Sequence, residues 1–102
     1  MYLIEILLPT FGPTGERFPK ENFDRVRAEL TDRFGGVTAF LLSPAFGLWR
    51  DEKGELQHDD IAIFEVMAGH LDREWWQDYR EQLEQRFQQQ EIVVRAAPTE
   101  RL

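Results

Sequence analysis

Two amphipathic helical stripes, each flanked by short apolar runs, constrain the fold of this chain more than any other feature. In the first stripe, apolar residues recur at spacings of three and four, which predicts one face of a helix. These residues are Phe23, Val26, Leu30 and Phe34. Pro19 suits the first turn of this helix, and Gly35 is expected to end it in a left-handed conformation.

The second stripe carries its own start signal. Asp72 is predicted to cap the helix by accepting a hydrogen bond from a free backbone N–H, and Leu71 and Trp76 have the spacing of a hydrophobic staple. The apolar positions of the stripe are Trp76, Tyr79, Leu83 and Phe87. Trp75 lies at the edge of the stripe, about 100° around the helix from Trp76, and is expected at a rim or an interface.

Extended runs surround both helices, and their order predicts the fold. Their expected ranges are 2–8, 37–42, 46–50, 60–67 and 91–97. Ser43-Pro44 interrupts the second strand, because proline has no N–H to donate to a ladder, and 46–50 then forms a hairpin arm. The β-α-β-β-α-β order predicts one α+β, ferredoxin-like domain over residues 1–102. Its four-stranded antiparallel sheet has the expected order 4-1-3-2, with both helices on one face.

The amino-acid composition argues against two classes of binding partner. The chain has 19 acidic and 12 basic residues, a formal charge of −7, which argues against nucleic acid and an anionic membrane surface as partners. No apolar run approaches the ~20 residues that span a bilayer, and the N-terminus lacks the basic region of a signal peptide. We therefore expect a soluble, cytoplasmic protein.

No metal or cofactor is expected. The chain has no cysteine, so a thiolate metal site is excluded. His58, Asp59 and Asp60 are adjacent, and neighbouring residues on a strand point to opposite faces, which is poor geometry for holding one ion.

The sheet face away from the helices carries the candidate site. Side-chain alternation places Glu5, Glu65 and Arg95 on that face, among Leu, Ile, Val and Met residues. A buried carboxylate needs a partner, and Arg95 is expected beside Glu5 because strands 4 and 1 are neighbours. Glu65 is left to pair across a dimer, to face a water pocket, or to carry a raised pKa suited to proton transfer. A structural Glu5–Arg95 pair and a functional pocket lined by all three charges both stay open.

The strand order and the motif "RFGGVTAF…GLW…DDIAIFEV" resemble known proteins. The order, with its apolar and lightly charged open face, resembles the dimeric α/β-barrel group of ferredoxin-like proteins. That group includes antibiotic-biosynthesis-type monooxygenases, muconolactone isomerase-like proteins and stress-responsive barrel proteins. The motif is similar to a set of small uncharacterised bacterial proteins that combine FGG-x-T, G-x-W and a following hairpin strand. The resemblance implies a homodimer with facing sheets, and it offers no catalytic motif to carry over.

Three functions follow from these patterns. The first is self-association in a homodimer, since a contiguous exposed apolar face usually marks a partner site. The second is a cofactor-independent enzyme of isomerase or monooxygenase type, with Glu65 as acid/base and Arg95 or Glu5 setting its pKa. The third is a module that binds a small apolar or aromatic ligand at the bend from Phe46 to Trp49. Trp49 is then either an interface anchor or the wall of a pocket.

Overall fold

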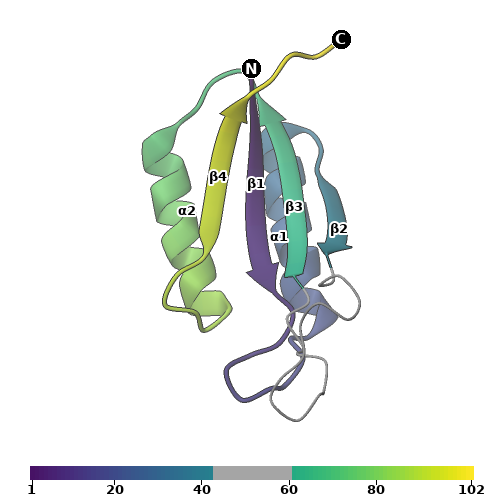
Figure 1. Cartoon of the computed structure of the whole chain (residues 1–102), viewed down its shortest axis with the longest axis vertical. Helices are drawn as coiled ribbons and strands as arrows, with labels where there is room; N and C mark the ends of the chain where they lie inside the picture. Colours follow the sequence, from purple (N-terminus) through teal and green to yellow (C-terminus); the bar gives the residue numbers. More distant parts are fainter. Residues whose placement is uncertain (43–60) are drawn as a thin grey trace, which may run out of the picture.

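One antiparallel sheet with two helices behind it forms the fold in the computed structural model, which describes residues 1–42 and 61–102 (Figure 1). The elements are β1 Tyr2–Pro9, α1 Lys20–Phe34, β2 Thr38–Leu42, β3 Ile61–Ala68, α2 Arg73–Arg86 and β4 Val93–Pro98. This arrangement confirms the predicted α+β class and the predicted order of elements. The expected hairpin arm at 46–50, with Phe46 and Trp49, lies outside the described residues.

The strands lie in the order β2-β3-β1-β4, which is the predicted order 4-1-3-2 read from the other edge. Every neighbouring pair is antiparallel, and β1 and β3 are central. Each helix connects two strands that are separated by one other strand, so the chain crosses the sheet twice. Figure 1 shows both helices on the same side of the sheet, which leaves the opposite face, called the open face below, turned toward the viewer.

The core lies between the sheet and the helices, where the alternation of the strands predicted it. On β1, the side chains of Ile4, Ile6 and Leu8 are at most 1% exposed, while the residues between them are half-buried. The other large residues of the core are Val26, Leu30, Phe64, Val66, Trp76, Tyr79, Leu83 and Phe87. Both predicted helical stripes therefore face the sheet, because burying one stripe of each helix removes most of its apolar surface from water.

The ends of α1 follow the predicted signals. Pro19 immediately precedes the helix in an extended conformation, and its carbonyl accepts a hydrogen bond from the Asn22 N–H. Gly35 adopts φ = 81° and donates its N–H to the Thr31 carbonyl, which closes the last turn. This left-handed conformation costs glycine least, so Gly35 allows the chain to turn from α1 toward β2.

The start of α2 confirms the predicted cap, but the segment after it corrects a strand boundary. The Asp72 carboxylate accepts a hydrogen bond from the Trp75 N–H at 3.1 Å. After α2, Gln88 reverses the chain with φ = 53°. The prediction that the last strand begins at 91 is wrong by two residues. The Ile92 N–H donates to the Glu84 carboxylate at 3.0 Å, so it is occupied before the ladder with β1 begins.

A carboxylate joins the two helices. Glu29 on α1 accepts two hydrogen bonds from the Arg86 guanidinium, one of them at 2.8 Å, and a third from the Tyr79 hydroxyl at 3.0 Å. The Arg86 guanidinium, with help from that hydroxyl, holds the pKa of Glu29 below its usual range. Burial and the adjacent Glu29 raise the pKa of Tyr79, so its hydroxyl stays protonated and donates. Every partner in this cluster is satisfied, which fits a structural role.

Candidate functional site

A row of four polar side chains crosses the open face, one from each strand. The strand registers place Glu5 opposite both Glu65 and Arg95, and they place Glu65 opposite Thr38. Side chains directly opposite one another have Cβ atoms about 4.5–5.5 Å apart. The structure therefore brings the three predicted residues, Glu5, Glu65 and Arg95, into one cluster, called the charged row below.

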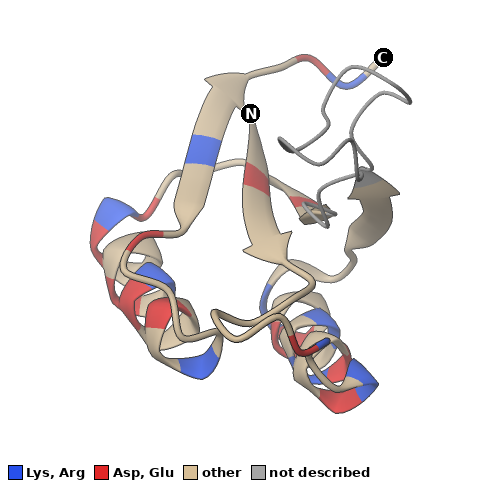
Figure 2. Ribbon diagram, turned by 60° about the horizontal axis from the view of Figure 1, so that its bottom comes forward, with Lys and Arg blue, Asp and Glu red and all other residues tan. Residues whose placement is uncertain are grey.

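The charged row contains all the ionisable charge of the four strands. Charged residues gather on the two helices and in the connecting segments, while the strands carry only single coloured bands (Figure 2). Elsewhere on the strands the open face is apolar, so the row stands out as the one polar feature of the described sheet.

Arg95 pairs with Glu5, as the predicted strand order requires. The Arg95 Nε donates to Glu5 Oε1 at 3.0 Å, and the Arg95 side chain is 57% exposed. The Arg95 guanidinium is the main reason that the pKa of Glu5 lies below its usual range. The expected Glu5–Arg95 pair is therefore present in a single chain.

Glu65 has no cation of its own in the described chain. Its carboxyl is hydrogen-bonded to that of Glu5, and partial burial, followed by the proximity of Glu5, raises the pKa of Glu65. The same hydrogen bond helps to lower the pKa of Glu5. The guanidinium of Arg95 thus serves Glu5 alone, and the two carboxyls titrate as a unit in which Glu65 holds its proton to higher pH.

A carboxyl with a raised pKa is suited to donate or accept a proton, but acid–base catalysis also needs a place for the substrate. Glu65 lies on the open face and does not line the apolar pocket that the helix side of the sheet forms. Arg95 borders a wide groove between α2 and β4. The catalytic assignments of Glu65, Arg95 and Glu5 stay predictions.

Apolar side chains flank the charged row on both sides. In one direction along the strands, Phe40, Ile63, Leu7 and Val93 lie opposite one another across the sheet. In the other direction, Met67 lies opposite Leu3, which lies opposite Ala97. Phe40, Met67 and Val93 are 42%, 47% and 47% exposed, respectively. Large apolar groups thus remain in contact with water on both sides of the row.

Trp75, predicted at a rim or an interface, is half-buried on the helix side and does not reach the open face. Its ring stacks on Tyr79 at a centroid distance of 4.9 Å and meets Phe34 edge-on at 5.6 Å. The Arg33 guanidinium lies 4.0 Å from its ring centre, within the range of a cation–π interaction. Trp75 therefore packs α1 against α2. The other two ligand or interface candidates, Phe46 and Trp49, lie outside the described residues.

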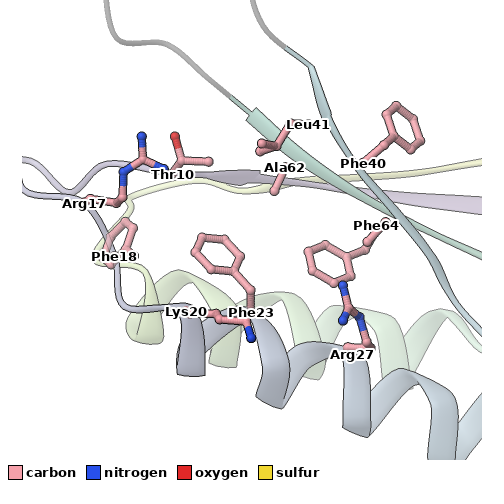
Figure 3. A pocket seen from close by; sticks show the side chains of 11 residues that line it. Thr10, Arg17, Phe18, Lys20, Phe23, Arg27, Phe40, Leu41, Ala62 and Phe64 are labelled. Carbon is pink, nitrogen blue, oxygen red and sulfur yellow. The ribbon is translucent and has the colours of Figure 1, made fainter.

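The sequence reasoning missed a pocket of about 370 Å³ between α1 and the β2–β3 side of the sheet, called the α1 pocket below. Figure 3 shows Phe18, Phe23 and Phe64 between the sheet and the helix, with Arg27 rising from α1 toward them. A signal was present in the sequence, because Phe23 and Arg27 are four residues apart and so share one face of the helix.

Two kinds of feature are absent from the part of the chain that the structure describes. Within residues 1–42 and 61–102, no cluster of three or more His, Asp or Glu side chains could hold a metal ion. In the same residues, no helix combines the length and the apolar character needed to cross a membrane.

The fold and the charged row define a ferredoxin-like α+β domain with an open sheet face. No protein family, curated protein or solved structure matches this chain.

Proposed function

We propose that this chain is a homodimer-forming domain that self-associates through its open face, in the manner of the dimeric α/β barrels that its sequence resembles. The supporting observation is the apolar face around the charged row, with Phe40, Met67 and Val93 each more than two-fifths exposed. Leaving such a patch in water is unfavourable, and a second sheet covers it with matching shape and periodicity.

The arrangement of charges in the charged row supports a second copy of this chain as the partner that covers the open face. A two-fold axis parallel to β1, running between β1 and β3, stacks β4 of one copy over β2 of the other. Arg95 of each copy then lies over the end of the row that holds Thr38 and Glu65 in the other copy. The contact provides Glu65 with the cation that its own chain gives to Glu5.

Sedimentation velocity at micromolar concentration tests the proposal. The expected result is a species of twice the chain mass of 12.1 kDa. Met67→Lys is expected to produce monomers, because it places a charge in the apolar part of the contact beside the charged row, while the side chain is already exposed in the single chain. Ala28→Lys is the matched control, since Ala28 is exposed on α1 and should leave the dimer intact.

A wild-type chain that sediments as a monomer at these concentrations would contradict the proposal. So would a dimer that Met67→Lys and Ala28→Lys leave equally intact, because the contact would then lie elsewhere. Circular dichroism of each variant establishes that the fold is retained, so that loss of the dimer is not confused with unfolding.

A further inference from the structure

The α1 pocket lies on the helix side of the sheet, and among its lining residues Phe40 also belongs to the apolar row of the open face. Its walls are the rings of Phe18, Phe23 and Phe64, with the small residues Ala39 and Ala62 on the sheet side. Its volume of about 370 Å³ falls at the lower end of the range of small-molecule sites, roughly 300–1,000 Å³. The walls thus offer room for one small apolar group.

Backbone hydrogen bonds fix the loop that brings Phe18 to the pocket. The Phe18 N–H donates to the Thr10 carbonyl at 3.0 Å, and the Gly12 N–H donates to the Glu16 carbonyl at 2.7 Å. Gly15 turns the loop with φ = 84°, a conformation that favours glycine. Phe18 also packs edge-on against Phe87 of the core at 5.1 Å, so this wall of the pocket is anchored on both sides.

The polar lining of the pocket is cationic. Arg17, Lys20 and Arg27 all border it, and no Asp or Glu does among the described residues. This concentration of positive charge contrasts with the net charge of −7 of the whole chain. The local potential at the mouth therefore favours an anion.

The three cationic side chains differ in the interactions that they already make within the chain. The Arg17 guanidinium lies 4.9 Å from the Phe11 ring centre, and the Lys20 ammonium approaches Asp24 only at 4.0 Å with both side chains well exposed. For Arg27, the described part of the chain offers neither a hydrogen bond nor an ion pair, and Figure 3 shows its guanidinium directed toward the sheet beside Phe64. Arg27 is therefore placed to receive a carboxylate with two parallel N–H donors.

We propose that the α1 pocket binds a small organic carboxylate with an apolar body. The apolar body lies among Phe18, Phe23 and Phe64, and the carboxylate pairs with Arg27, with Arg17 and Lys20 adding to the positive potential. Charge complementarity at the mouth and apolar walls behind it select this combination over a neutral apolar molecule and over an inorganic anion.

Fluorescence titration with 2-naphthoate and its neutral analogue 2-naphthamide tests the proposal on the full chain. The expected result is binding of 2-naphthoate at least tenfold tighter than 2-naphthamide. Arg27→Gln should remove this preference, whereas Arg27→Lys should keep part of it. Arg25→Gln is the matched control: it makes the same change on the same helix, outside the pocket, and should keep the preference in full.

A second variant tests the apolar half of the site. Ala39→Leu adds bulk inside the pocket and leaves every cation in place, so it should weaken both probes tenfold or more. Amide chemical shifts locate the binding, and they should move in α1, β2 and the loop at 10–18. The proposal is overturned if neither probe binds at millimolar concentration, if both bind equally well, or if the shifts map to another surface. Equal preference in Arg25→Gln and Arg27→Gln would overturn the role of Arg27.

Discussion

This domain contains two carboxylate clusters, which differ in the number of hydrogen-bond donors available to each carboxylate. Between the helices, one carboxylate, Glu29, receives hydrogen bonds from both Arg86 and Tyr79. On the open face, the guanidinium of Arg95 bonds Glu5, and the neighbouring Glu65 contacts no cation among the described residues. The pKa of Glu29 is lowered and that of Glu65 is raised, so the first cluster is complete within one chain and the second is not.

The difference separates a carboxylate with donors from two side chains, Glu29, from a carboxyl, Glu65, that contacts no cation among the described residues. A satisfied cluster between packed elements stabilises one arrangement of the helices. A cluster with one cation too few, surrounded by exposed apolar groups, is expected to gain from contact with a second surface. The following changes probe that contrast, from the largest expected effect to the smallest.

Arg86→Met should lower the free energy of unfolding by about 2 kcal/mol, because Glu29 stays partly buried and loses both guanidinium hydrogen bonds. Arg95→Met should cost much less, since Arg95 is 57% exposed and water solvates the group that remains. Urea unfolding at pH 7, at a protein concentration at which the chain sediments as a monomer, measures both. Equal losses for the two variants would remove the contrast between the clusters.

The loss of stability at acidic pH should depend on Glu29. Its pKa in the folded chain lies below the unfolded value of 4.5, so its contribution is fully present above pH 4.5 and is lost as the pH falls through the folded value. Unfolding free energies from pH 7 to pH 3 should therefore fall more in the wild type than in Glu29→Gln. Parallel profiles would show that Glu29 is not the titrating group.

Tyr79→Phe should cost about 1 kcal/mol, because it removes one donor from Glu29 and keeps the ring that stacks on Trp75. Tyr2→Phe is a matched control, since no hydrogen bond of the Tyr2 hydroxyl occurs within the described residues. Thermal unfolding followed by circular dichroism compares the two. A loss in the control as large as in Tyr79→Phe would indicate a general effect of the hydroxyl.

Glu65→Gln should have the smallest effect and the opposite sign. Because the pKa of Glu65 is raised in the folded chain, its ionisation costs stability as the pH rises through that value, and the cost is absent below pH 4.5, where both states are protonated. The variant should therefore gain stability over its parent at pH 7 and not at pH 4. The comparison is made at a protein concentration at which sedimentation shows monomers, so that dimerisation does not contribute, and a gain at both pH values would contradict it.

Sequence patterns alone predicted the order of helices and strands and which strands are neighbours within the sheet. The helical stripes, the cap at Asp72 and the glycine exit at Gly35 depend on interactions within a few residues, so spacing alone predicted them. The β-α-β-β-α-β order then made strands 1 and 4 neighbours and predicted the Glu5–Arg95 pair. The boundary at Ile92 was missed because a side chain from α2, Glu84, takes its N–H.

By itself, the sequence determined which residues turn to the helices and which to the open face, because a period of 2 or 3.6 is a local property of the chain. Only the tertiary structure decided that Glu65 stands directly opposite Glu5, that Glu29 meets Arg86, and that a pocket opens beside Arg27. Strand register, helix docking and cavity volume depend on how distant segments pack together. The spacing of residues along the chain does not by itself reveal these long-range contacts.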